Sequence, residues 1–210
     1  MMFFEPSKGH GLPHSPISAC VAPRPIGWIS TVSADGIHNL APFSYFNLVH
    51  NFPPTVMFSC NGLKPDGTPK DSWVNAENTG EFVYNVATYD LREEVNLSST
   101  AWGSEVSEID EVGLASIQSR LVQPLRVAAS PIQFECKTIE VLHLPTERPE
   151  NPNTIVFGHV VGVHIDDACL TDGMVDYNKV RHISRLGYLD FAEMGPRFQL
   201  PRVYVKKEQD

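Results

Sequence analysis

The sequence predicts a mainly β protein with a few helices, in which about six strands pair in antiparallel fashion. Three observations favour this class. Seventeen prolines and fourteen glycines divide the 210 residues into short segments. Several of these segments alternate apolar and polar side chains with a period of two, and few helical patterns lie between them. A doubly wound sheet would need a helix after each strand, so we expect a small closed or split barrel.

The first two strands form a predicted hairpin. Residues 26–33 alternate in the manner of a half-buried strand. Residues 34–36 supply a turn, in which Gly36 can adopt positive φ without steric cost. Residues 37–41 return as the second strand. Pro42 cannot donate to a ladder, so we expect this strand to end or bulge there.

A helix is predicted after a loop rich in glycine and proline. Segment 70–72 opens this helix, which ends near Thr79 and is followed by Gly80 in the position that favours glycine. Asp71 or Ser72 can cap the first turn through a side-chain oxygen.

Shorter elements surround this helix. Residues 55–60 and 81–87 read as strands, the first of them buried. A second helix begins at Asp90, and Glu93 three residues later completes a pair that resembles a capping box. Residues 98–112 are acidic and polar, which predicts an exposed loop.

Two long strands dominate the second half of the chain. The apolar phase of residues 132–142 slips by one position, which is typical of a β-bulge. A polar connection at 143–153 leads to residues 155–165, which are apolar on both faces and predict a central strand. Residues 171–173 form a turn.

Composition and charge exclude several classes of function. The formal net charge of −9 would repel nucleic acid and anionic membranes, so neither is an expected partner. No signal peptide and no run of about 18 apolar residues is evident, which predicts a cytoplasmic location. The cysteines are far apart and form no CxxC pair, which favours buried thiols in a reducing cytoplasm: Cys20, Cys60, Cys136 and Cys169.

The chain resembles a known family in several motifs, which occur in the expected order. They are PRPIGWIST at 23–31, APFSYFN at 41–47, KDSWVNAENTGEFVYNV at 70–86, LREEVNLSS at 91–99, SPIQFEC at 130–136, FGHVVGVHIDD at 157–167 and SRLGYLDF at 184–191. These motifs resemble those of the flavin reductase-like family of FMN-binding split-barrel proteins, which includes flavoredoxins and the reductase components of two-component flavin monooxygenases. The resemblance implies a six-stranded antiparallel split barrel at residues 23–191, with a leader at 1–22 and an extension at 192–210.

The family resemblance also implies a homodimer with FMN at the subunit interface and a monooxygenase or another electron-transfer protein as partner. FMN carries a dianionic phosphate, for which Arg24 can supply a guanidinium fork and Lys70 a point charge. Backbone N–H groups at the start of the predicted helix would complete the phosphate site. Asp71 is negative, so we assign it to capping or orientation.

By resemblance, Ser30, Thr31, Lys70 and Ser72 fall on phosphate- and ribityl-binding positions, and residues 41–47 lie along the isoalloxazine ring. The full set of candidate cofactor-binding residues is Arg24, Trp28, Ser30, Thr31, Val32, Ala41, Pro42, Ser44, Tyr45, Asn47, Ser59, Lys70, Asp71, Ser72 and Arg185. FAD is the alternative flavin.

The predicted reaction is hydride transfer from NAD(P)H to flavin N5, which needs no protein nucleophile. We therefore expect no catalytic side chain, and the sequence has no GxGxxG motif for a separate dinucleotide domain. NAD(P)H would stack on the exposed flavin face, with His159 as a candidate contact. His10 and His14 lack further ligands, so no metal site is expected.

Alternative interpretations stay open. Trp28 suits hydrophobic packing better than ring stacking, and His159 suits a hydrogen-bonded core position better than a ligand contact. Arg24 can also be solvated, and Arg185 can cap a last helix instead of binding the cofactor. An electron carrier or redox sensor without NAD(P)H activity, and an interaction module with a vestigial pocket, are the other function classes. A pyridoxamine-phosphate oxidase type fits the motifs less well.

Overall fold

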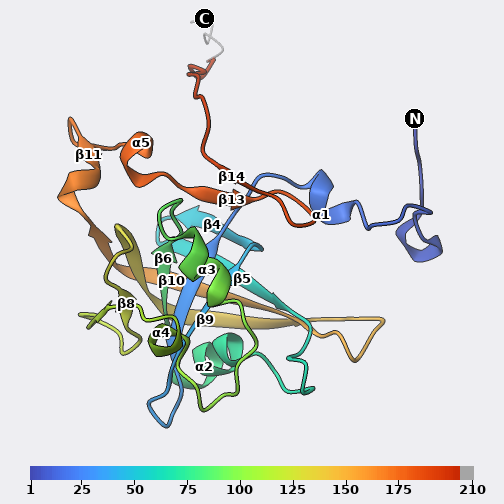
Figure 1. Ribbon diagram of the computed structural model, residues 1–210, viewed down its shortest axis with the longest axis horizontal. Helices are drawn as coiled ribbons and strands as arrows, with labels where there is room; N and C mark the ends of the chain where they lie inside the picture. The colour runs from blue at the N-terminus through green and yellow to red at the C-terminus, as the bar shows by residue number, and fades with distance from the viewer. Residues whose placement is uncertain (204–210) are drawn as a thin grey trace, which may run out of the picture.

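The computed structural model describes residues 1–203, and its centre is an antiparallel sheet of seven strands (Figure 1). The strands follow one another in the order β3-β2-β6-β9-β10-β5-β4. Their bounds are β2 (Gly27–Val32), β3 (His38–Phe43), β4 (Phe46–Asn51), β5 (Pro54–Asn61), β6 (Glu81–Val86), β9 (Ile132–Leu144) and β10 (Asn153–Ile165). The predicted mainly β fold with few helices is therefore confirmed.

The strand count differs from the prediction by one. The seventh strand is β4, which pairs with β5 from Phe46 opposite Phe58 to Asn51 opposite Pro54. The sequence indicated a break here because two prolines follow one another. Pro53 lies in the turn and Pro54 is the first residue of β5, before the pairing with β10 begins at Thr55, so their missing N–H donors cost little.

The first hairpin forms as predicted, with one difference at its end. β3 continues through Pro42, which lies opposite Trp28, to Phe43. The expectation that the strand ends or bulges at Pro42 is therefore wrong by one residue. β3 is the edge strand on this side of the sheet, so the absent N–H of Pro42 breaks no ladder on its outer side.

A bulge interrupts the long β9–β10 ladder where the sequence predicts it. Phe157 lies opposite Glu140, whereas Gly158 lies opposite Thr138, so Ile139 is the extra residue. A Cβ atom at Gly158 would lie 2.4 Å from the ring of Phe82, which explains the glycine there. The prediction of a central strand is also confirmed, because β10 lies between β9 and β5.

Helix α2 (Asp71–Thr79) has the predicted bounds, and Gly80 follows it with φ 72° in the left-handed region. The predicted caps are wrong. Lys70 occupies the N-cap position, and within residues 1–203 no side chain caps the first turn. Asp71 accepts hydrogen bonds from Lys64 and Ser104 instead.

Two predictions for the segment after β6 need correction. Helix α3 (Arg92–Leu97) begins two residues after Asp90, and among the described residues it has no side-chain cap. Residues 98–112 are only partly an exposed loop, because α4 (Glu108–Glu111) buries Glu108 and Ile109. A four-residue acidic helix has too little periodicity to separate it from a loop by pattern alone.

Short elements cover the ends of the barrel. They are η1 (Pro6–Lys8), α1 (Ile17–Cys20), β1 (Arg24–Pro25), β7 (Ser116–Ile117), β8 (Arg126–Val127), η2 (Asp167–Cys169), β11 (Leu170–Thr171), β12 (Met174–Val175), α5 (Tyr177–Val180), β13 (Ile183–Arg185) and β14 (Phe191–Glu193). The predicted turn at 171–173 joins β11 to β12. Strands β1, β13 and β14 form a small sheet, which lies with α1 at the opposite end of the barrel from α2 (Figure 1).

Strand β2 is buried on both faces because two apolar clusters meet there. Ile29 belongs to a cluster that includes Phe58 and Phe82, whereas Trp28 belongs to a second cluster with Leu40 and residues of α3 and α4. The predicted half-buried strand is therefore wholly buried.

Three of the four cysteines are buried as expected, but Cys20 is exposed, which corrects that prediction. Burial raises the pKa of the Cys60 thiol to about 12. Among the described helices, none is long and apolar enough to cross a membrane. Residues 204–210 of the predicted C-terminal extension lie outside the described residues.

Candidate functional site

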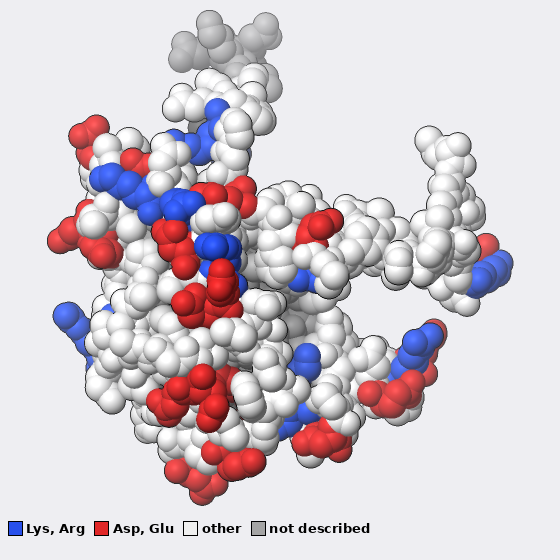
Figure 2. All heavy atoms as spheres, in the orientation of Figure 1, with Lys and Arg blue, Asp and Glu red and all other residues white. Residues whose placement is uncertain are grey.

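Two adjoining cavities form one elongated cleft on the barrel. Each has a volume of about 310 Å³, and both are lined by Pro42 and Ser99. Cavity 1 is lined by Ser18, Arg24, Ile26, Pro42, Ser44, Tyr45, Val95, Asn96, Ser99, Arg185, Tyr188 and Phe191. Cavity 2 is lined by Asn39, Ala41, Pro42, Phe43, Leu63, Lys64, Pro65, Lys70, Asp71, Ser72, Ser98, Ser99, Thr100, Ala101, Trp102 and Glu108. Figure 2 shows this face hollowed below the α1 segment, with Lys and Arg side chains beside the hollow.

Cavity 2 contains the N-terminus of α2. Lys70 precedes the helix, and the free N–H groups of a first turn favour an anion. Asp71 would oppose an anion there, but its charge is offset. Its carboxylate accepts from Lys64 Nζ at 3.0 Å and from Ser104 Oγ at 2.7 Å. The basic character of this end therefore depends mainly on Lys70 and the helix.

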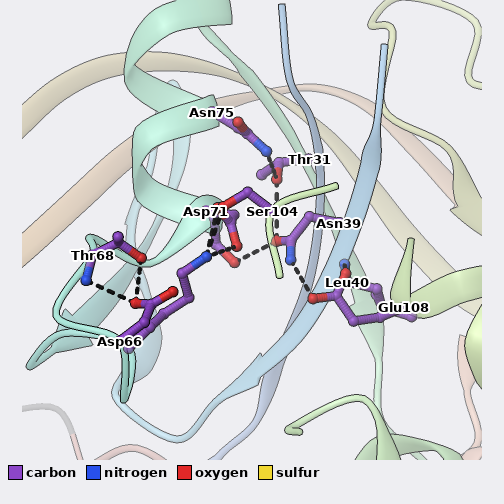
Figure 3. Close-up of polar contacts among 11 residues, drawn as sticks. Thr31, Asn39, Leu40, Asp66, Thr68, Asp71, Asn75, Ser104 and Glu108 are labelled. Carbon is purple, nitrogen blue, oxygen red and sulfur yellow. Dashed lines mark hydrogen bonds and ion pairs between the residues drawn. The ribbon is translucent and has the colours of Figure 1, made fainter. Parts of the chain in front are cut away.

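A buried hydrogen-bond network fixes the wall of cavity 2 (Figure 3). Its centre is Asn39 on β3, whose Nδ2 donates to Glu108 Oε1 at 2.8 Å. Asn39 Oδ1 accepts from Ser72 Oγ at 2.7 Å and from Thr31 Oγ1 at 3.3 Å. Asn75 Nδ2 then donates to Thr31 Oγ1 at 3.1 Å. The network thus connects α2, β2, β3 and α4 near the N-terminus of α2.

Glu108 completes this network from α4. Its Oε2 accepts from the backbone N–H of Leu40 at 3.0 Å, and only 5% of the residue is exposed. Burial raises the pKa of Glu108, although the hydrogen bonds from Leu40 and Asn39 act in the opposite direction. The carboxyl group therefore holds two donors of β3 in place and orients the Asn39 amide.

Cavity 1 is lined by two guanidinium groups. Arg24 is 8% exposed and donates to the main-chain oxygens of Ser18 and Val21, which anchors the α1 segment. Its guanidinium lies 5.6 Å from the ring centre of Tyr45. Arg185 lies over the ring of Phe191 and donates to the main-chain oxygen of Tyr188.

The structure brings many of the predicted cofactor residues to the cleft. Those that line cavity 1 are Arg24, Pro42, Ser44, Tyr45 and Arg185. Those that line cavity 2 are Ala41, Pro42, Lys70, Asp71 and Ser72. Arg24 and Lys70 line different cavities, so the structure does not bring them to one point. Arg185 lies on a strand, so the alternative role as a helix cap is wrong.

Six predicted residues line neither cavity. They are Trp28, Ser30, Thr31, Val32, Asn47 and Ser59. The Trp28 side chain is wholly buried and donates to Ser98 Oγ at 2.9 Å, and Ser59 donates to Asn153 at 2.8 Å. Ser30 and Thr31 are wholly buried, whereas Asn47 is exposed on β4. Thr31 still reaches the site through Asn39.

His159 also lies away from both cavities. It faces Thr55 across β10 and β5, and its Nδ1 lies 3.1 Å from Thr55 Oγ1. This geometry supports the interpretation of a hydrogen-bonded structural histidine over a ligand contact. Among the described residues, no cluster of histidine, cysteine or carboxylate side chains could hold a metal ion.

Sequence reasoning missed several residues that line the cleft, notably Lys64, Ser99, Trp102 and Glu108. Trp102 and Glu108 lie in residues 98–112, for which the sequence predicts an exposed loop. Trp102 Nε1 is buried without a hydrogen-bond partner among residues 1–203. An aromatic side chain in an otherwise polar loop was the one available signal.

The fold and the site define a small antiparallel β-barrel protein with an elongated cleft that carries basic side chains at each end. A family model described as a flavin reductase-like domain matches residues 20–184, which is more than half of the chain. The chain therefore belongs to the flavin reductase-like family.

Several individual proteins are similar to this chain in sequence or in structure. An uncharacterised protein of Halalkalibacterium halodurans is 35% identical over 190 residues, which is 90% of each chain. Nitrilotriacetate monooxygenase component B of Bacillus cereus has a similar structure, with a TM-score of 0.87, 26% identity and coverage of 95% of this chain and 98% of that one. A protein with a split barrel domain from Shewanella frigidimarina matches with a TM-score of 0.76, 22% identity and coverage of 89% and 90%. The predicted split barrel is thus confirmed.

Proposed function

We propose that this protein binds FMN in the cleft and acts as an NAD(P)H:flavin oxidoreductase. The observation that carries the proposal is the position of β3, whose Ala41 and Pro42 line the cleft between two basic ends. A cleft of this form suits a ligand that joins a flat ring to a phosphate. The volume of each cavity lies at the lower end of the range of about 300–1,000 Å³ for small-molecule sites.

The residues of cavity 2 fit the phosphate of FMN. Lys70 supplies an ammonium group and α2 supplies an uncapped first turn, whose N–H groups need acceptors. Ser72 is held by Asn39 at the same place. The ring system would then lie along residues 41–45, where β3 leads into β4, and FAD is the alternative ligand. Arg24 lines the other cavity and is therefore not part of this phosphate site.

A bound flavin supplies the hydride acceptor, N5, and the residues of this chain bind and orient the reactants. Pro42 lies at the boundary of the two cavities and presents a rigid apolar surface there. The hydrogen-bonded wall behind it keeps the cleft from changing shape. The cleft would hold the flavin and the nicotinamide next to each other, and the hydride would pass directly between them. The proposed mechanism therefore requires no nucleophilic side chain.

We further propose a homodimer with the flavin at the subunit interface. Exposed apolar side chains on β4 and the adjacent turn support this proposal: Leu48, Val49 and Phe52. A cytoplasmic location and a monooxygenase or electron-transfer partner complete the proposal. The monooxygenase partner is supported by the similarity to a protein named as component B of a monooxygenase.

One experiment tests the central part of this proposal. The purified protein is titrated with FMN, its visible spectrum is recorded, and the consumption of NADH and NADPH is followed with and without free FMN. We expect flavin binding and NAD(P)H oxidation that FMN stimulates. Flavin binding without NAD(P)H oxidation would show an electron carrier or redox sensor, and failure to bind any flavin would refute the proposal altogether.

A further inference from the structure

Cavity 1 carries a buried positive charge that the described part of the chain does not neutralise. Arg24 is 8% exposed, and its hydrogen-bond partners are neutral main-chain oxygens. Within residues 1–203 it takes part in no ion pair. Its Nε is buried and has no hydrogen-bond partner there. A buried charge of this kind is costly unless an anion pairs with it.

A second guanidinium group adds to this charge. Arg185 lines the same cavity, and the one hydrogen bond described for it uses a single nitrogen, Nη2, so other donors of its planar fork are available. Among the described residues that line cavity 1, none is acidic. This is unusual for a chain with a net charge of −9 and indicates a local site for an anion.

The chemistry of the two arginines favours a phosphate group as the anion. Guanidinium groups bind phosphates through paired N–H donors, with a geometry that a lysine cannot reproduce. Cavity 2 differs because it contains Asp71 and Glu108 beside its lysines and the N-terminus of a nine-residue helix. If cavity 2 holds the phosphate of FMN, the arginines of cavity 1 are left for a second phosphate ligand.

We propose that Arg24 and Arg185 bind the diphosphate of the nicotinamide dinucleotide that reduces the flavin. This inference rests on the proposed function and assigns its electron donor to a defined part of the cleft. Ser44 and Tyr45 line cavity 1, so the diphosphate lies beside the segment that we assign to the flavin ring. A folded dinucleotide bound there can place its nicotinamide against the ring. The donor site is thus at Arg185 and not at His159.

The test uses Arg185→Gln, because Arg24 also anchors α1 and its loss would disturb the fold. Arg148→Gln is the matched control, since Arg148 is exposed in the loop between β9 and β10. ADP-ribose, which has the diphosphate but no nicotinamide, is titrated calorimetrically into the FMN-loaded proteins. FMN affinity is measured separately on the flavin-free proteins, and thermal unfolding checks that each variant is folded.

We expect Arg185→Gln to weaken ADP-ribose binding and to raise the KM for NAD(P)H by about 10-fold to 100-fold, the effect of losing charged hydrogen bonds. FMN affinity should change by less than about 2-fold, and Arg185→Lys should restore part of the lost affinity because it keeps the charge. An equal loss of FMN affinity would overturn the inference, because it would assign the arginines to the flavin phosphate. Unchanged ADP-ribose binding in the folded variant would also overturn it.

The failure of this inference is distinguishable from failure of the proposed function. If the wild-type protein oxidises no NAD(P)H with or without FMN, the proposed function fails, whereas the ADP-ribose titration still reports on cavity 1. If NAD(P)H is oxidised but Arg185→Gln matches Arg148→Gln in every measurement, the reductase stands and the diphosphate site does not.

Discussion

The two ends of the cleft carry basic side chains in different ways. At the α2 end, Lys64 is paired with Asp71, and a buried network centred on Asn39 connects four elements of the fold. At the other end, the described contacts of Arg24 and Arg185 are main-chain oxygens and aromatic rings. The difference teaches that the number of basic residues does not define an anion site. What matters is how much of their charge other groups of the protein already offset.

The largest expected effect is on FMN binding at the α2 end. Lys70→Ala should raise the Kd for FMN by about 10-fold to 100-fold, because it removes a charge-assisted hydrogen bond to the phosphate. Quenching of FMN fluorescence during titration measures this change. Lys8→Ala is the control, since Lys8 lies in the exposed N-terminal segment and pairs with Glu5. Equal Kd values for the two variants would remove the phosphate from this end of the cleft.

The second effect tests the hydrogen-bonded wall. Glu108→Ala leaves the Asn39 amide and the Leu40 N–H without their acceptor, which should lower the free energy of unfolding by about 1–3 kcal/mol. FMN affinity should also fall, because Ser72 depends on the orientation of Asn39. Urea unfolding and FMN titration measure the two quantities.

The control for this variant lies on the same short helix. Glu111→Ala removes an exposed carboxylate of α4 and should change the free energy of unfolding by no more than about 0.5 kcal/mol. If Glu108→Ala proves as mild as Glu111→Ala, the network does not support the site.

The smallest effect is on the pH dependence of stability. Burial raises the pKa of Glu108 in the folded protein, so the folded state binds its proton more readily than the unfolded state. The contribution of this group to the free energy of unfolding should therefore decrease as pH rises from about 4.3, the unfolded value, through the raised folded value. Urea unfolding of the wild type and of Glu108→Gln at several pH values between the unfolded and the folded pKa measures this contribution to the free energy of unfolding. We expect the stability of the wild type relative to Glu108→Gln to fall as pH rises across this window. A wild type that instead gains stability relative to Glu108→Gln with rising pH would contradict the assignment.

The sequence predicted those elements whose signals are local. The turn at Gly36, the end of α2 at Gly80 and the bulge near Ile139 each follow from a few adjacent residues. Strand β4 was missed because Pro53 and Pro54 indicate a break, and the residues before them have no clear alternation that would predict a strand. Local patterns therefore predicted the barrel but not its edge strand β4.

The site was predicted less completely because its contacts are distant in sequence. Asn39 and Glu108, which share a hydrogen bond, are 69 residues apart in the sequence, and no periodic pattern predicts this contact. The family motifs named Ser30 and Thr31, but neither side chain lines the cleft. The separation of Arg24 from Lys70 required the three-dimensional arrangement, since both look like equivalent basic residues in a linear chain.

A crystal structure of the FMN-loaded protein tests the central claim most directly. The account predicts the FMN phosphate at Lys70 and the first turn of α2, with the ring along residues 41–45 and cavity 1 free of flavin phosphate. A phosphate bound instead between Arg24 and Arg185 would contradict the assignment of the two ends of the cleft.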